Sequence, residues 1–256
     1  MAETAAVAAA VTQDAFLGGR LILHQPREGH RAGSDAILLA AAAPADISGL
    51  ALDIGAGVGA AGLSLAMLRR GLTFGLVEND PALAVLARKN LAVNGLAESG
   101  FVHEADVLDP QSRRAAGLLD GSAALIISNP PFLDPARVRQ SPQAGKRSAH
   151  VMPAGATLEE WMAACLALLT DGGLLIMIHR PDALAQMLAA VEGRGGSVGL
   201  LPIHPQAGKP AVRILLRVKK GSRSPLAIVP PLVLHEGGRF TAIAEALHRG
   251  ENLLAW

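Results

Sequence analysis

A polar amide beside two prolines is the feature of this sequence best suited to chemistry on nitrogen. Asn129-Pro130-Pro131-Phe132 follows the apolar run Ala123–Ile127. The prolines fix φ and remove two backbone donors, which leaves carbonyls free to accept hydrogen bonds. The Asn129 carboxamide oxygen and the Pro130 carbonyl could each accept one N–H of a planar amino group, while Phe132 stacks on the ring that carries it. The segment predicts a site that directs a nitrogen lone pair at an electrophile; the alternative is a proline-rich strand exit with a core phenylalanine.

A glycine-rich turn stands earlier in the chain, in Asp53-Ile54-Gly55-Ala56-Gly57-Val58-Gly59. With Ala60 it loosely satisfies the fingerprint of a dinucleotide-binding turn, in which a pyrophosphate lies at a helix N-terminus. Asp53 argues against that ligand, because its negative charge would lie beside the phosphates. A carboxylate here suits a ligand with an ammonium group. The remaining interpretation is an ordinary tight turn between a strand and a helix.

Further acids follow the next two apolar runs. Glu78, with Asn79 beside it, stands where an acid typically accepts hydrogen bonds from the ribose hydroxyls of an adenosine. Asp106 could accept from an adenine amino group while Val107 supplies apolar contact. Each acid alone is more often a solvated loop residue or a helix cap. With Asp53 they mark the carboxyl ends of three successive predicted strands, the edge at which open α/β sheets bind ligands.

The elements that must position these residues begin at Leu50, where short apolar runs alternate with segments of helical periodicity. Few charges interrupt the runs, as expected when helices cover both faces of a parallel sheet. Strands are predicted at Ala51–Ile54, Thr73–Val77, Gly100–His103, Ala123–Ile127, Leu174–Ile178, Ser197–Pro202 and Val212–Val218, and helices at about Ala60–Arg70, Pro81–Asn94, Leu158–Leu169 and Asp182–Gly193. The predicted fold class is α/β, with a seven-stranded, mostly parallel sheet and helices on both faces.

Local signals refine the helices. Asp80 is expected to cap the second helix, with Pro81 at its first position. Trp161 and Cys165 are expected to be packing residues on the apolar face of the third.

The two ends of the chain add smaller pieces to this core. Residues 1–48 are predicted to form a frayed tail, a hairpin at Ala15–Gln25, and a helix that Ser34 and Asp35 could cap and that ends before Pro44. Residues 49–256 form the main domain, which closes with an extended stretch at Ala227–Leu234 and a helix near Thr241–Arg249. The longest stretch without periodicity, Phe132–Thr157, is a candidate lid or substrate-binding segment.

Composition narrows the class of protein. The chain has 256 residues, 50% of them hydrophobic, a net charge of +1 and one cysteine, so it cannot form an intramolecular disulfide or a cysteine-rich metal site. We expect no membrane span, no secretory signal and a cytoplasmic location. No metal is expected, because His24, His30, His150 and His179 match no zinc-binding spacing. The balanced charge means that a nucleic-acid partner would need a local basic patch. The sequence contains no signal for one oligomeric state over another.

The glycine turn and the Asn129–Phe132 segment together resemble the S-adenosylmethionine-dependent N-methyltransferases of Rossmann-like, class I fold. That resemblance implies S-adenosyl-L-methionine as cofactor and S-adenosyl-L-homocysteine as product. It implies that Asn129, Pro130, Pro131 and Phe132 hold the target nitrogen. The implied cofactor-binding residues are Asp53, Ile54, Gly55, Ala56, Gly57 and Gly59 for the methionine part, Glu78 and Asn79 for the ribose, Asp106 and Val107 for the adenine, and Asn129 at the reacting centre.

A narrower resemblance covers more of the chain. Arg31-Ala32-Gly33-Ser34-Asp35-Ala36-Ile37-Leu38-Leu39, Gly208-Lys209-Pro210 before Arg213, and Phe240-Thr241 are similar to the bacterial tRNA adenine N6-methyltransferases that modify the anticodon loop of a valine tRNA. It implies RNA, with tRNA foremost, as the partner. Basic and polar residues around the predicted site are the expected substrate contacts: Arg31, Ser34, Asp35, Arg137, Lys146, Arg147, Lys209 and Arg213.

The leading hypothesis is a methyltransferase that acts on N6 of adenine in tRNA. Guanine N2-methyltransferases of ribosomal RNA and glutamine N5-methyltransferases of release factors share the same amide-and-proline segment and remain alternatives. An NAD-dependent dehydrogenase would give Asn129-Pro130-Pro131-Phe132 no role. A non-catalytic RNA-binding module is the remaining class.

Overall fold

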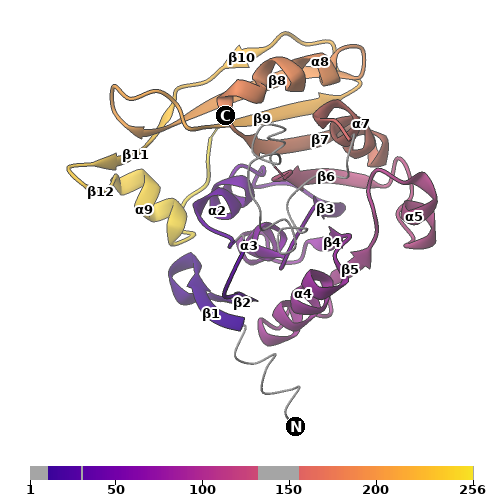
Figure 1. Ribbon diagram of the computed structural model, residues 1–256. Coiled ribbons are helices and arrows are strands. Elements are labelled where there is room, and N and C mark those ends of the chain that lie inside the picture. Colours follow the sequence, from indigo (N-terminus) through magenta and orange to yellow (C-terminus); the bar gives the residue numbers. More distant parts are fainter. Residues whose placement is uncertain (1–10, 30, 132–155, 256) are drawn as a thin grey trace, which may run out of the picture.

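The computed structural model describes residues 11–29, 31–131 and 156–255, which form one central sheet with helices on both faces (Figure 1). The sheet contains ten strands. Their bounds are β3 (Leu50–Ile54), β4 (Thr73–Glu78), β5 (Gly100–Glu104), β6 (Ala123–Ser128), β7 (Leu169–His179), β8 (Gly195–Gln206), β9 (Arg213–Lys220), β10 (Ala227–Ile228), β11 (Leu232–Glu236) and β12 (Arg239–Phe240).

The strand order is β12-β11-β8-β9-β7-β6-β3-β4-β5, with β10 paired to β8. Neighbours from β5 to β7 are parallel, whereas β9 runs antiparallel to both β7 and β8. All seven predicted strands are present in this sheet, so the predicted fold class is confirmed. The short strands β10, β11 and β12 extend it on the β8 side, where the sequence predicted only an extended stretch.

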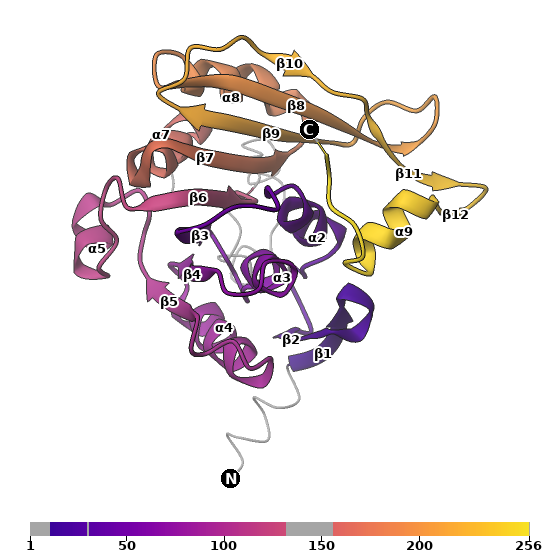
Figure 2. The same ribbon diagram turned by 180° about the vertical axis from the view of Figure 1, so that it is seen from behind.

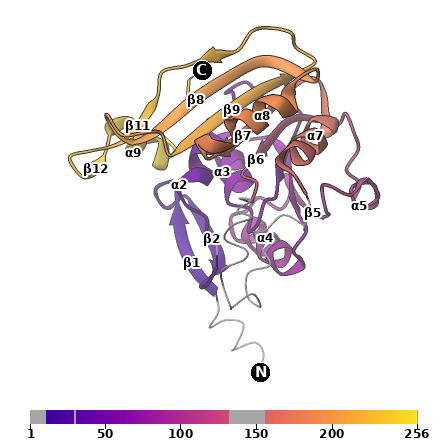
Figure 3. The same ribbon diagram turned by 45° about the horizontal axis from the view of Figure 1, so that its top comes forward.

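Helices occupy both faces of the sheet. Their bounds are α2 (Ser34–Ala41), α3 (Ala60–Leu68), α4 (Pro81–Val93), α5 (Pro110–Ala115), α7 (Leu158–Leu168), α8 (Leu184–Val191) and α9 (Ala242–His248), with 3-10 turns η1 (Leu17–Gly19) and η3 (Pro181–Ala183). Figure 3 shows α7 and α8 on one side of the sheet and α2 and α3 on the other. Successive strand residues supply the two cores: Leu125 and Ile127 of β6 pack with α2 and α3, while Ile126 packs with α7 and α8.

Helix starts show where local signals were sufficient. Asp80 caps α4 as predicted, and its carboxylate accepts from the Ala82 N–H at 2.8 Å. The predicted capping of α2 by Ser34 and Asp35 is wrong, because Gly33 occupies the N-cap position with no side-chain hydrogen bond. Helix α5 was not predicted, although Asp109 caps it through the same Asp-Pro signal that begins α4.

The C-terminal elements return to the start of the fold. In Figure 2 the chain after α9 runs back past α2, and the Leu254 N–H donates to the Ala41 carbonyl at 3.0 Å. Arg20, directly after η1, donates to the carbonyls of Arg249 and Gly250 at 2.7 and 2.8 Å. The segment after α9 is therefore joined both to α2 and to the turn of the N-terminal hairpin. None of the helices formed by the described residues is long and apolar enough to cross a membrane.

The N-terminal hairpin is held by two amide side chains at the C-terminal end of α4, one in its last turn and one at its C-cap. Strands β1 (Val11–Phe16) and β2 (Leu21–Pro26) form a separate antiparallel pair that contacts α4. Asn94 accepts from the Ile22 N–H at 2.9 Å and donates to the Ile22 carbonyl at 2.7 Å. One turn earlier, Asn90 bonds both backbone groups of His24 in the same way. The two amides act as substitutes for a neighbouring strand along this edge of β2.

We expect Asn94→Ala to loosen the hairpin while leaving α4 intact. The change leaves the Ile22 backbone groups without their side-chain partner and should lower the free energy of unfolding by about 1–3 kcal/mol. Urea unfolding measures the total, and amide exchange at Ile22 locates it. The control is Lys89→Ala on the exposed side of α4, which should change neither quantity. Unchanged exchange at Ile22 in the Asn94 variant would contradict the anchoring role.

Candidate active site

The two chemically distinctive segments leave the sheet side by side. In the register of the sheet Ile54 of β3 pairs with Ser128 of β6, so Gly55 and Asn129 follow neighbouring strands at the same level. From β3 the chain continues to β4 on one side, whereas β6 lies on the other side. The strand order therefore reverses at this pair, which is the place where open α/β sheets bind ligands.

The backbone of the glycine turn favours glycine at its start, middle and end, and Gly55 at its start has φ of 72°. Gly57 has φ of 59° and Gly59, the N-cap of α3, has φ of 88°, both in the left-handed region. A Cβ at Gly59 would lie 2.7 Å from the Leu76 side chain, so the turn fits closely over β4. A Cβ at Gly57 would meet nothing within 4 Å. The turn is therefore packed at its end and open at its middle, where a ligand could approach the backbone.

Most N–H groups of this turn are already used within the protein. Gly55 and Ala56 both donate to the Val77 carbonyl, at 2.9 and 3.0 Å. Gly57 donates to the Glu78 carboxylate at 2.7 Å. A turn that binds pyrophosphate presents such groups to the ligand, so this arrangement disfavours the dinucleotide interpretation.

Two buried carboxylates hold the turn. Glu78 is 6% exposed and accepts from the N–H groups of Gly57, Asn79 and Asp80. Burial raises the pKa of Glu78 above its usual range, while these hydrogen bonds oppose the rise. Asp53 is 3% exposed and accepts from the Gly62 N–H in the first turn of α3 at 2.8 Å. Burial raises the pKa of Asp53 to about 7, against the opposing effect of that hydrogen bond.

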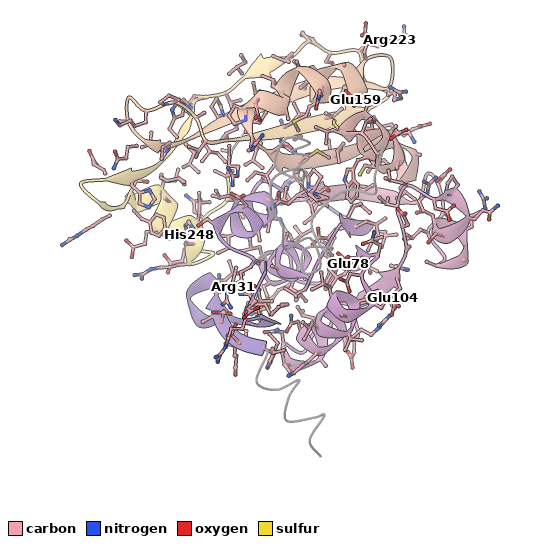
Figure 4. The ribbon with its side chains drawn as sticks, viewed as in Figure 1. Arg31, Glu78, Glu104, Glu159, Arg223 and His248 are labelled. Carbon is pink, nitrogen blue, oxygen red and sulfur yellow. The ribbon has the colours of Figure 1, made fainter. Side chains whose placement is uncertain are left out.

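The next strand supplies the remaining predicted cofactor residues. Asp106 accepts from the Leu108 N–H at 2.9 Å and so shapes the loop after β5. Val107 is buried in the core shared with α7, which limits its role to apolar packing beneath the site. Asn79 is exposed beside the start of α4. The Glu78 and Glu104 labels of Figure 4 lie near the ends of β4 and β5, and Glu104 pairs with Arg88 at 2.5 Å.

A tryptophan connects the glycine turn with the amide-and-proline turn. The Ser128 hydroxyl, which is fully buried, donates to the Ile54 carbonyl at 2.8 Å and accepts from Trp161 Nε1 at 3.0 Å. Asn129 is half-buried, Pro130 is buried, and Phe132 lies outside the described residues. The sequence identified Trp161 as a packing residue only. Its hydrogen bond depends on a serine far away in the chain, so no local signal could have found it.

Residues 31–190 match the family described as the methyltransferase small domain. The chain belongs to this family. The match confirms the predicted enzyme class and, with it, the predicted cofactor, S-adenosylmethionine. The site fits that cofactor, because buried carboxylates can accept from ammonium, hydroxyl and amino groups, and Gly57 leaves space beside the turn.

Two named relatives and one solved structure are similar to this chain over most of its length. The tRNA1(Val) (adenine(37)-N6)-methyltransferase of Erwinia tasmaniensis is 30% identical over 73% of this chain and 74% of that protein. A release factor glutamine methyltransferase of Mycolicibacterium smegmatis is 28% identical over 66% of this chain and 59% of that protein. A crystal structure of a predicted O-methyltransferase from Agrobacterium tumefaciens superposes with a TM-score of 0.72 and 32% identity, over 87% of this chain and 99% of that one.

Most of the predicted substrate contacts that the structure describes are bonded to other groups of this methyltransferase. Arg31 donates to Asp14 at 2.6 Å, beside the hairpin (Figure 4). Asp35 accepts from Arg213 at 2.8 Å, which joins α2 to β9. Ser34 lies 2.8 Å from His248 Nε2 on α9. Lys209 is exposed in the loop between β8 and β9. The other three, Arg137, Lys146 and Arg147, lie outside the described residues.

A cavity of about 160 Å³ lies next to the second proline of the methyltransferase's amide-and-proline turn. Pro131, Leu158, His179 and Gln186 are among the residues that line it. It opens where β7 ends and α8 begins, on the side of the turn away from Glu78. The amide-and-proline turn therefore has a cavity on its β7 side.

We expect the free energy of unfolding of this methyltransferase to depend on pH through the ionisation of Asp53. An unfolded aspartate ionises near pH 3.8, whereas folded Asp53 holds its proton until about pH 7. The folded state therefore binds more protons between these values, and Asp53 lowers the free energy of unfolding as pH rises from about 4 to about 7. Urea unfolding across this range should show a smaller fall in Asp53→Asn than in the wild type. Parallel curves for the two proteins would contradict the raised pKa.

Proposed function

We propose that this methyltransferase transfers a methyl group from S-adenosylmethionine to N6 of an adenine in tRNA. The observation that carries the proposal is the position of Asn129 directly beside the glycine turn, at the reversal of the strand order. The tRNA1(Val) relatives, which share about three quarters of their length with this chain, support the choice of acceptor. A tRNA substrate also agrees with the cytoplasmic location expected from the sequence.

The cofactor end of the site is assigned by its carboxylates. When bound, S-adenosylmethionine supplies a methyl group on a positively charged sulfur. In this proposal Asp53 pairs with its ammonium group, Glu78 accepts from its ribose hydroxyls, and Asp106 accepts from its adenine amino group. Glu78 already accepts three N–H groups through its two oxygens, so it is oriented before any ligand arrives. Such preorganisation reduces the ordering cost of binding.

The acceptor end is assigned to the amide-and-proline turn. The Asn129 carboxamide oxygen and the Pro130 carbonyl would accept the two N–H groups of the adenine amine and direct its lone pair toward the methyl group. Phe132, by resemblance, would stack on the base. The attacking nitrogen becomes strongly acidic once it is methylated, so its proton can pass to water and the chain needs no general base. Positioning then supplies most of the rate enhancement.

An adenine inside a folded tRNA must leave its stack to reach this turn. Basic residues would hold the flanking phosphates: Arg31, Lys209 and Arg213 among the described residues, and Arg137, Lys146 and Arg147 outside them. Those with carboxylate partners, such as Arg213 with Asp35, would contribute less than exposed Lys209. Ser34 and Asp35 would then serve by placing His248 and Arg213.

A release factor glutamine is the second candidate acceptor. Its side-chain amide offers the same planar NH₂ group to Asn129 and Pro130, and a relative with that name matches 66% of the chain. Guanine N2 in ribosomal RNA is the third. These acceptors differ in the molecule that carries the amine, so the cofactor assignments are common to all three.

The deciding experiment is transfer of labelled methyl from S-adenosylmethionine to separate fractions of bacterial tRNA, ribosomal RNA and protein. Nucleoside mass analysis should find N6-methyladenosine in tRNA, and RNase treatment should abolish the labelling. Label only in protein, resistant to RNase, would replace the adenine by a glutamine side chain. Methylguanosine in ribosomal RNA would move the acceptor to guanine N2.

We expect Asn129→Ala to lower kcat at least ~10²-fold with the cofactor Kd nearly unchanged, because the amide contacts the acceptor nitrogen in this proposal. Steady-state kinetics and calorimetric titration with S-adenosylhomocysteine measure the two quantities. Asn252→Ala, which removes an exposed amide near the C-terminus, is the matched control and should leave both unchanged. An equal loss of kcat and cofactor affinity would contradict this division of labour.

We expect Asp53→Asn to weaken cofactor binding and to flatten its pH dependence. Wild-type affinity should rise as pH passes through about 7, because the ionised form of Asp53 pairs with the ammonium group. An asparagine offers Gly62 the same acceptor oxygen without a charge that titrates. Titrations with S-adenosylmethionine between pH 6 and 8 test this. A wild-type affinity that stays constant over this range would argue against the pairing.

A further inference from the structure

We propose that Trp161 is a positioning residue for methyl transfer, acting through Ser128. Trp161 lies on α7 and is 7% exposed. Its Nε1 donates to the Ser128 hydroxyl at 3.0 Å, and that hydroxyl donates to the Ile54 carbonyl at 2.8 Å. The two hydrogen bonds run from α7 to β6 and on to β3, across the point where the strand order reverses.

The indole also touches the glycine turn directly. A Cβ built at Gly55 would lie 3.0 Å from Cζ2 and 3.2 Å from Cη2 of Trp161. The ring therefore occupies the space beside the first residue of the turn, and glycine is the residue that leaves room for it. One side chain thus contacts both segments of the site: Gly55 by its ring and Ser128 by its N–H.

The positions of Ser128 and Ile54 in the chain connect these hydrogen bonds to the two turns of the site. Gly55 follows Ile54, and Asn129 follows Ser128, so the hydroxyl of Ser128 joins the last residues before the two turns. The indole N–H orients that hydroxyl toward the Ile54 carbonyl, because an oxygen that accepts from Trp161 directs its own hydrogen elsewhere. Trp161 therefore sets the separation between the Asn129 amide and the turn that holds the methyl donor. This inference rests on the role proposed for Asn129.

Methyl transfer is sensitive to that separation. The nitrogen, the methyl carbon and the sulfur must lie in line at near-attack distance, and a displacement of about 1 Å can cost ~10²-fold in rate. A residue that only filled the core would change stability and leave kcat unchanged. A positioning residue lowers kcat while the cofactor and acceptor still bind.

The test compares Trp161→Phe, Ser128→Ala and the double variant. Phenylalanine keeps an aromatic ring near Gly55 and removes the N–H. We expect Trp161→Phe to lower kcat about 10-fold, with the acceptor KM and the S-adenosylhomocysteine Kd within about 3-fold of wild type. Ser128→Ala should lower kcat at least as much. The double variant should match Ser128→Ala, because both changes remove the same hydrogen bond. Independent, multiplying effects would overturn the proposal.

Leu168→Ala is the matched control for lost stability. Leu168 is fully buried on the same helix and belongs to the same core cluster as Trp161. We expect it to lower Tm at least as much as Trp161→Phe while kcat stays within twofold of wild type. If the two variants lose kcat in parallel at equal loss of Tm, the role of Trp161 is structural and the proposal fails.

Tryptophan fluorescence tests this inference without an acceptor molecule, so the result does not depend on which acceptor is methylated. The chain has two tryptophans, so Trp256→Phe leaves Trp161 as the single emitter. S-adenosylhomocysteine should change its emission, and Ser128→Ala should shift the emission before any ligand is added. An emission unaffected by saturating ligand and by Ser128→Ala would overturn the proposal. If methyl is transferred to protein or ribosomal RNA instead of tRNA, the proposed function fails. The same kcat comparison is then made on that acceptor, and it still tests the role of Trp161.

Discussion

The candidate site depends on the hydrogen bond that the Ser128 hydroxyl donates to the Ile54 carbonyl. It is fully buried, it lies where the strand order reverses, and it joins the residues that precede the glycine turn and the amide-and-proline turn. Neighbouring parallel strands bring two chain segments close, but their ladder does not determine how the turns beyond the strand ends are placed. The hydrogen bonds of one serine and one tryptophan supply that placement.

The glycine turn is held at several points by groups from separate elements. Asn90 donates to the Val58 carbonyl at 2.9 Å, and the same amide bonds the backbone of His24 in β2. The N-terminal hairpin and the turn therefore share one fully buried amide. Buried amides and carboxylates are costly unless they are satisfied, and here Asn90, Asp53 and Glu78 are satisfied by backbone groups of the glycine turn, of α3 and of β2. The hairpin is thereby tied to the glycine turn through Asn90.

Much of the fold could be predicted from local patterns, and the two failures at helix starts have identifiable physical causes. The strand runs and the Asp80-Pro81 helix start were predicted because burial and capping act on neighbouring residues. Helix α5 was missed although Asp109-Pro110 carries the same signal, since a helix of six residues is too short to show apolar periodicity. The capping role predicted for Asp35 was wrong because Gly33 occupies the N-cap position, and the Asp35 carboxylate accepts from a distant residue, Arg213, instead.

The sequence by itself determined the class of the sheet, the two chemically distinctive turns and the order of acids along its edge. These follow from residue types at fixed local spacing, which the periodicity of strands and helices converts into position. Only the tertiary structure decided which polar groups meet: Ser128 with Trp161, Asn90 with Val58, Arg31 with Asp14. The physical reason is that such pairs are chosen by packing and desolvation among residues remote in the chain, where local spacing carries no information.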